Sequence, residues 1–243
     1  MRFAIYGAGA IGAYLGAKLS VAGEDVALIA RGPHLKAMRE NGVRIRSAEG
    51  DFTAKVLATD DPAEVAEVDV VVLAVKAHGL TAIAPLLEPM LGPNTIVIPA
   101  QNGIPWWYFQ GHGGPWEGTR LDSVDPGGVI TKHIATERII GCVVYPAATI
   151  VEPGVIQHEE GNRFSLGELD GSSSERCKAL SAAIGNAGLR APIRSNIRQE
   201  IWVKLLGNLA FNPVSALTKA SMVEIATDPE ASAVARAMME EAY

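Results

Sequence analysis

Apolar residues are grouped along the first hundred positions in short runs that are separated by mixed segments. One run, at residues 68–75, is nearly continuous, which is typical of a parallel strand buried on both faces. Residues 11–22 are spaced as in a helix instead. Other strand-like runs lie at 3–6, 26–30, 43–45, 52–56 and 95–99, with a hairpin expected around 49–51. This alternation predicts an α/β fold with a parallel sheet in the N-terminal part.

The second half of the chain changes from strands to helices. Strand-like runs continue at 139–145, 154–158 and 164–167. Three serines at 172–174 then offer a helix N-cap. We therefore expect an N-terminal domain at 1–171 and an all-helical C-terminal domain at 172–243. The segment 106–128 is rich in aromatic and turn residues, and it is either a substrate lid or a loop packed by its own aromatics.

A glycine pattern follows the first strand directly and opens the first helix. It reads Gly-x-Gly-x-x-Gly, with Gly7, Gly9 and Gly12 at the fixed positions. The first glycine allows a tight turn, the second lets the backbone approach a pyrophosphate, and the third lets helix and strand pack closely. Free amides at the helix start, at Ala10 and Ile11, then face the phosphates. The pattern predicts a Rossmann-type dinucleotide-binding unit.

The end of the second strand indicates which dinucleotide is bound. NAD-binding members of this fold carry an acidic residue there, which accepts hydrogen bonds from the adenosine ribose, but this chain has Arg31. Glu24 and Asp25 precede the strand and so lie at the wrong end. A guanidinium offers forked, permanently charged donors that suit a 2'-phosphate. We therefore predict NADP(H) as the cofactor, with an ordinary surface arginine as the alternative.

Two polar residues follow the ends of successive strands. Lys76 comes directly after the run at 68–75, and Asn102 lies in the segment Ala100-Gln101-Asn102-Gly103 after the next strand. Ligands of open α/β sheets bind beyond the carboxyl ends of the strands, so both residues are candidates for the nicotinamide end of a site. For either residue alone a turn or capping role is equally good, because Asn-Gly is a common turn pair.

Polar residues also interrupt an apolar helical segment near the C-terminus. Lys204, Asn208 and Asn212 are four positions apart in WVKLLGNLAFNP, so they lie along one stripe of a helix. The stripe is either a solvated face or a row of hydrogen-bonding groups lining a cleft, and the bulky apolar residues around it favour the cleft. Pro213 disfavours helical geometry at the preceding residue, so we expect Asn212 at the helix end.

Together these motifs resemble the ketopantoate reductases, NADPH-dependent enzymes of pantothenate biosynthesis that reduce 2-dehydropantoate to pantoate. The resemblance covers essentially the whole chain, and it implies a Rossmann-type domain followed by a helical domain. The lysine and asparagine helix and the Gln-Asn-Gly segment are its most specific parts. Its motifs are the glycine pattern at 7–12, Arg31, Val-Lys at 75–76, Gln-Asn-Gly-Ile-Pro at 101–105 and the helix at 202–212.

The resemblance also implies a role for each motif residue. Lys204 would be the general acid, which fits the chemistry, because hydride delivery to a ketone builds negative charge on the carbonyl oxygen and an ammonium stabilises it. Asn102 would act with it at the reacting carbonyl. Asn208 and Asn212 would bind the substrate, a 2-oxo acid. The residues that would hold NADP(H) are Gly7, Gly9, Ala10, Ile11, Gly12, Arg31, Lys76 and Asn102.

One departure from the family leaves alternatives open. The chain stops at Tyr243 inside a helix that begins near 228–229, whereas the family continues through helices that carry a serine and a glutamate used on the substrate. We therefore expect an incomplete helical domain whose apolar surface promotes self-association, with a homodimer as one outcome. The alternatives are a β-hydroxyacid dehydrogenase-like oxidoreductase, whose glycine-rich helix start is missing at 196–200, and a non-catalytic NADP-binding sensor or scaffold.

Composition limits the remaining classes of function. The chain has 243 residues, a formal charge of -6 and a pI near 5.4, so we expect no surface for nucleic acid. Cys142 and Cys177 are far apart and the histidines are scattered, so we expect no metal site and a reducing cytoplasm. Glycines break the N-terminal apolar stretch, which argues against an export signal, and no other segment is long enough to span a membrane.

Overall fold

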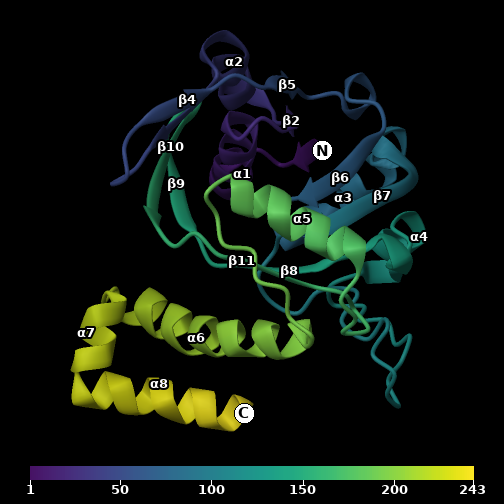
Figure 1. The fold of residues 1–243 in the computed structure, drawn as a ribbon. Coiled ribbons are helices and arrows are strands. Elements are labelled where there is room, and N and C mark those ends of the chain that lie inside the picture. The colour runs from purple at the N-terminus through teal and green to yellow at the C-terminus, as the bar shows by residue number, and fades with distance from the viewer. The chain divides into compact units, whose positions relative to one another are not determined.

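The computed structural model describes all 243 residues and divides them into two compact units, Met1–Ile197 and Arg198–Tyr243. The first unit contains a parallel sheet with the strand order β5-β2-β1-β6-β7 (Figure 1). The predicted α/β fold is therefore confirmed. Its strands are β1 (Arg2–Tyr6), β2 (Asp25–Ile29), β5 (Leu57–Thr59), β6 (Val68–Leu73) and β7 (Leu91–Pro99). The order reverses beside β1, and ligands of such sheets bind at this switch point.

Helix α1 (Ala10–Val21) contacts both the parallel sheet and a second sheet of four strands, in the order β4-β3-β10-β9. The strands of the second sheet are β3 (Val43–Arg46), β4 (Phe52–Ala54), β9 (Ala147–Glu152) and β10 (Val155–Glu160). The expected hairpin is confirmed, because β3 and β4 pair antiparallel with Val43 opposite Ala54. Strand β9 was not predicted from the sequence, and most of its side chains are exposed.

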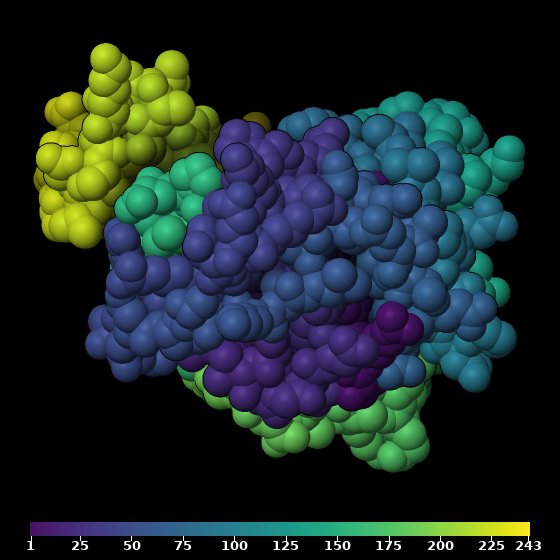
Figure 2. Space-filling model, turned by 90° about the horizontal axis from the view of Figure 1, so that it is seen from above, coloured from purple at the N-terminus to yellow at the C-terminus, as the bar shows by residue number.

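The remaining helices of the first unit are α2 (Gly32–Asn41), α3 (Leu80–Ile83), α4 (Val129–His133) and α5 (Glu175–Asn186), and β8 (Gly141–Val144) pairs with β11 (Phe164–Gly167). Helix α2 lies against the β9–β10 turn, where a Cβ on Gly154 would be 3.0 Å from the Cβ of Ala37. Figure 2 shows this neighbourhood on the surface, with the teal-green hairpin beside the violet-blue helix.

Helix α5 packs with the first unit, although its sequence position suggested the second domain. The hydroxyl of Ser174 caps it by accepting from the amide of Cys177, as the serine run predicted. Cys177 and Leu180 are fully buried in the same apolar core as the parallel sheet. The division between the units consequently falls after Ile197 and not at the expected boundary between residues 171 and 172.

The second unit contains only helices, namely α6 (Ile197–Thr218, of which Ile197 belongs to the first unit), α7 (Met222–Thr227) and α8 (Pro229–Ala242). Its small core contains Ala210, Val214, Ile225 and Ala235. Ser221 and Glu224 cap α7 reciprocally, and Asp228 caps α8. An apolar hollow lies between α6 and the end of α8, lined by Trp202, Leu206, Ala242 and Tyr243. None of the chain's helices combines the length and apolar character needed to cross a bilayer.

The expectation that Asn212 ends its helix is wrong. Helix α6 runs through Pro213 to Thr218, so Asn212 lies inside it. Tertiary contacts override the local preference, because Val214, directly after the proline, is buried in the core of the second unit. The hydroxyl of Thr218 also donates to the Val214 carbonyl at 2.7 Å, which ties the last turn together.

Replacing Pro213 by alanine should stabilise the second unit. The alanine amide could bond to the Leu209 carbonyl, and the ring that crowds this turn would be gone, which together are worth on the order of 1–3 kcal/mol. Urea denaturation followed by circular dichroism measures the change. Pro229→Ala is the matched control, because proline is favourable at the first position of α8 and its loss brings no gain. Equal effects of the two substitutions would contradict this account.

Candidate cofactor and active site

The glycine pattern forms the turn between β1 and α1. Gly7 has a φ of +99°, which disfavours any other residue, and a Cβ there would lie 2.7 Å from the amide nitrogen and Cγ1 of Val75. A Cβ on Gly12 would collide with the carbonyl oxygen of Gly7. The turn is held by Gly7 and Ala8, whose amides both donate to the carbonyl of Ile29, at 3.0 and 2.9 Å.

Open space lies in front of Gly9, the N-cap of α1. A Cβ on Gly9 would meet nothing within 4 Å, so a ligand can approach the backbone there. No side chain caps the helix, and its first turn holds no acidic residue. The first amides of α1, including those of Ala10 and Ile11, therefore lack intrahelical partners and present a positive end to an anion. Together, the open space at Gly9 and these free amides form a cradle that fits the pyrophosphate of a dinucleotide.

Arg31 lies where β2 ends and α2 begins. It is the exposed N-cap of α2, and its guanidinium pairs with no carboxylate of the protein. Burial raises the pKa of Tyr6, at the end of β1, and the nearby charge of Arg31 partly offsets that rise. Glu24 and Asp25 lie at the opposite end of β2. The first pairs with the N-terminal amine and the second with Arg2, at 3.3 Å, so neither is near a ribose bound at Arg31.

The start of α2 is fixed by a contact that the sequence did not reveal. The amide of Gly154, in the β9–β10 turn, donates to Nδ1 of His34 at 2.9 Å. The imidazole lies near the backbone of Ala8, and burial lowers its pKa, so the neutral ring is favoured. A bond between residues 120 positions apart has no local signature. This histidine therefore anchors the helix that carries Arg31 to the second sheet.

Lys76 and Asn102 follow neighbouring strands at the same edge of the sheet. Strands β6 and β7 pair in parallel, and their register ends at Leu73 opposite Pro99, three positions before each of the two residues. Both side chains are exposed. The side-chain amide of Gln101 donates to the carbonyls of Leu73 and Val75, at 2.6 and 3.1 Å, and so joins the two strand ends. The structure thus brings the predicted cofactor residues of the first unit to one edge.

The other three predicted residues lie in the second unit, on α6. Lys204 and Asn208 are partly buried and Asn212 is exposed. Because α6 is continuous over this stretch, the spacing of four residues places the three side chains along one stripe, with about 6 Å of rise between successive members. The stripe predicted from the sequence is therefore present as a feature of this helix.

The aromatic segment 106–128 is packed largely by its own residues. Phe109 contacts the rings of Tyr108, His112 and Trp116. Glu117 accepts hydrogen bonds from the amides of Gly111 and Gly113, and these bonds lower the pKa of its carboxyl. This packing favours the self-packed loop over the lid among the two alternatives.

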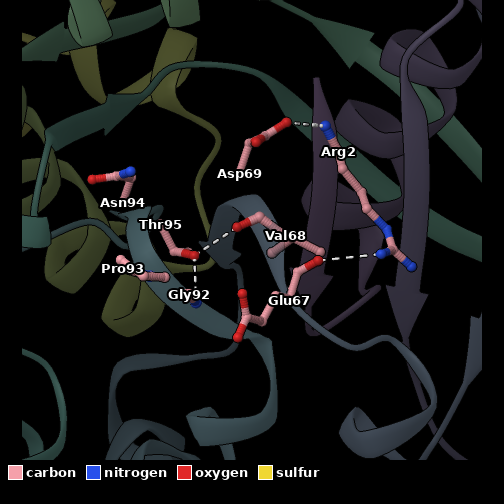
Figure 3. A pocket seen from close by; sticks show the side chains of 8 residues that line it. All are labelled: Arg2, Glu67, Val68, Asp69, Gly92, Pro93, Asn94 and Thr95. Atoms are coloured by element: carbon pink, nitrogen blue, oxygen red, sulfur yellow. Dashed lines mark hydrogen bonds between the residues drawn. The ribbon is translucent and has the colours of Figure 1, made fainter.

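A small pocket of about 270 Å³ lies at the other end of the sheet (Figure 3). Its polar groups bond to one another, as when Thr95 donates to the Val68 carbonyl at 2.6 Å and accepts from the Gly92 amide at 2.8 Å. Arg2 donates to the carbonyls of Val65 and Glu67 there. The pocket lies at the amino ends of β1 and β6, away from the glycine turn, and its bonds hold the strand ends together.

Two glycine substitutions should separate folding from binding at the turn. Gly12→Ala should destabilise the protein by about 3 kcal/mol, because its Cβ collides with backbone that cannot move aside. Gly9→Ala should fold normally but bind a dinucleotide at least about tenfold more weakly, because its Cβ enters the space that the phosphate needs. Thermal unfolding and NADPH titration measure both effects. A Gly9→Ala protein of unchanged affinity would argue against the cradle.

Comparison with known proteins identifies the family. The family model "Ketopantoate reductase PanE/ApbA" matches residues 3–106, and the model of its C-terminal region matches residues 196–243. Along its full length the chain is 52% identical to a 2-dehydropantoate 2-reductase of Mesorhizobium japonicum, and it covers 74% of that protein.

Two crystal structures agree with this assignment. That of a candidate ketopantoate reductase from Ralstonia solanacearum superposes with a TM-score of 0.94 at 45% identity, covering 99% of this chain and 75% of the other. That of a 2-dehydropantoate 2-reductase from Geobacter metallireducens has a TM-score of 0.85 at 28% identity, covering 100% of this chain and 74% of the other. The chain therefore belongs to the ketopantoate reductase family of oxidoreductases.

Proposed function

We propose that this protein reduces 2-dehydropantoate to pantoate with NADPH, a step of pantothenate biosynthesis. The observation that carries the proposal is the 52% identity, along the whole chain, to a 2-dehydropantoate 2-reductase. The open glycine cradle and the unpaired Arg31 support it independently, because they provide what a phosphorylated dinucleotide needs.

The first unit would hold the cofactor. Gly7, Gly9 and Gly12 shape the turn, and the amides of Ala10 and Ile11 would bind the pyrophosphate. Arg31 would bind the 2'-phosphate through charge-assisted hydrogen bonds. Lys76 and Asn102 would hold the nicotinamide end, since both lie beyond the carboxyl ends of β6 and β7. When bound, NADPH supplies the hydride that reduces the ketone.

The second unit would supply the proton and hold the substrate. The ammonium of Lys204 would stabilise the charge that develops on the carbonyl oxygen and then donate a proton to it. Lysine suits this task because it can release its proton, whereas arginine stays charged. Asn208 and Asn212 would bind the carboxylate and hydroxyl of the substrate without adding charge.

A substrate panel tests the proposal. The purified protein is mixed with NADPH and 2-dehydropantoate, or with other branched 2-oxo acids, and the loss of NADPH absorbance is followed. We expect the highest kcat/KM with 2-dehydropantoate. Faster reduction of another 2-oxo or 3-oxo acid would assign a different substrate. Tight NADPH binding without turnover of any acid would indicate a sensor or scaffold.

We also propose a homodimer and a cytoplasmic location. Large apolar side chains of the second unit are exposed and could be covered by a second copy. They are Val203, Leu217, Met222, Val223 and Val234. Cys142 and Cys177 are both free and buried, as suits a reducing compartment. Light scattering of the purified chain measures the oligomeric state directly.

Arg31→Ala should weaken NADPH binding while leaving NADH binding nearly unchanged. The loss of one charge-assisted contact to the 2'-phosphate costs on the order of 1.5–3 kcal/mol, and NADH lacks that phosphate. Fluorescence titration of both cofactors against both proteins measures the difference. Lys36→Ala is the matched control, because it removes an exposed positive charge from the same helix. Equal losses for the two cofactors would refute the assignment of Arg31.

Lys204→Ala should lower kcat roughly 10²-fold or more while leaving NADPH affinity nearly unchanged, as expected for a general acid that also stabilises charge. Steady-state kinetics and cofactor titration measure the two quantities. Lys178→Ala removes an exposed lysine from another helix and serves as the control. A kcat close to that of the unmodified protein would mean that Lys204 is not the general acid and belongs to an ordinary solvated helix face.

A further inference from the structure

One side-chain amide continues the pairing of β6 and β7 beyond its last backbone bond. The amide of Ala100 makes that last bond, to the Leu73 carbonyl at 2.9 Å. Nε2 of Gln101 then donates to the same carbonyl at 2.6 Å and to that of Val75 at 3.1 Å. The two strand ends are therefore joined for two residues past Leu73, on the segment that leads to Lys76.

The bond to Val75 matters because the backbone pairing of β6 with β7 ends at this point. The amide of Ala74 turns to the other neighbour and donates to the Tyr6 carbonyl at 2.8 Å. Without Gln101, the Val75 carbonyl would lose the donor that ties it to the β7 side, and a partly buried carbonyl without a donor is costly. Val75 directly precedes Lys76, and Gln101 directly precedes Asn102. The Gln101 side chain thus extends the spacing set by the strand pairing to the two segments beyond it.

The glycine turn has a separate anchor. The amides of Gly7 and Ala8 donate to the carbonyl of Ile29 at the end of β2. The two hydrogen bonds of the Gln101 side chain go to β6 and the segment after it, and not to β2. Arg31 likewise follows β2. The hydrogen bonds of the adenosine half therefore run to β2, although Gly7 also packs against Val75, whereas the side-chain bonds between the segments of Lys76 and Asn102 come from Gln101.

We propose that Gln101 is a positioning residue for the nicotinamide half of the site. It holds the segments of Lys76 and Asn102 at a fixed spacing, and its hydrogen bonds do not reach β2, the strand that precedes Arg31. The proposal rests on the proposed function, because it takes NADPH as the ligand of this edge. The two halves can be separated experimentally, because adenosine 2',5'-bisphosphate carries the 2'-phosphate and one 5'-phosphate but no nicotinamide.

The test replaces Gln101 by leucine, which keeps the size of the side chain and removes both donors. NADPH affinity and kcat should each fall about tenfold, while affinity for adenosine 2',5'-bisphosphate should stay within about twofold. Calorimetric titration measures both ligands. Gln157→Leu is the matched control, because Gln157 is also partly buried and donates to a backbone carbonyl, that of His158 at 3.2 Å. This control should change neither affinity nor kcat.

Equal losses for the two ligands, or no loss for either, would overturn the proposal. If the leucine variant does not fold, Gln101→Glu is measured in its place. Its carboxylate would face two carbonyl oxygens without a donor, whereas the protonated acid could donate to one of them. The two carbonyl oxygens raise the pKa of the introduced carboxyl above its ordinary value of about 4.3, so NADPH affinity relative to the unmodified protein should recover as the pH falls from about 8 to about 4.5. A ratio that does not change with pH would also overturn the proposal.

These titrations need no substrate. If the unmodified protein binds NADPH but does not reduce 2-dehydropantoate, the proposed substrate is rejected. The comparison of NADPH with adenosine 2',5'-bisphosphate still decides the role of Gln101.

Discussion

The close approach of α1 to the strands on both of its sides is the constraint on which the first unit depends. On the side of the parallel sheet, glycine lets the helix come so close that a Cβ on Gly16 would lie 2.6 Å from Cδ2 of Leu28. On the other side, Tyr14 stacks on His158 of β10, with ring centroids 4.4 Å apart. Because the helix cannot shift between two sheets without a clash, its N-terminal amides are held beside the end of β1 before any ligand arrives. The cofactor cradle is thus a consequence of packing.

Charge distinguishes the two ends of the parallel sheet. At the amino ends, the acidic groups are paired within the protein, as between Asp25 and the side chain of Arg2 and between Asp69 and the Arg2 amide. At the carboxyl ends, the exposed cations Arg31 and Lys76 pair with no carboxylate. The formal charge of the whole chain is -6, so these two unpaired cations stand out on a negative protein. Such an edge attracts an anionic dinucleotide to the place where its phosphates fit.

The sequence predicted the parts of the fold that have strong local signals. The buried strand at 68–73 and the glycine turn could be read directly, because continuous apolar runs and fixed glycine spacings follow from local geometry. Strand β9 could not, since its short run at 147–151 lacks the alternation of apolar and polar residues that marks a half-buried strand. The contacts of His34 and Gln101 were missed for another reason. They join residues 120 and 28 positions apart, and only the folded chain reveals such partners.

Helix α6 continues through Pro213, and the polar stripe of Lys204, Asn208 and Asn212 stays on one helix although proline disfavours helical geometry there. Proline penalises the turn before it, and Pro213 removes the hydrogen bond that would reach the Leu209 carbonyl. Any distortion therefore falls between Asn208 and Asn212, while the turn from Lys204 to Asn208 keeps all of its backbone donors. The rise of about 6 Å between Lys204 and Asn208 is thus the better fixed of the two intervals. The exposed Asn212, at the distorted end, is the member of the stripe that the helix constrains least.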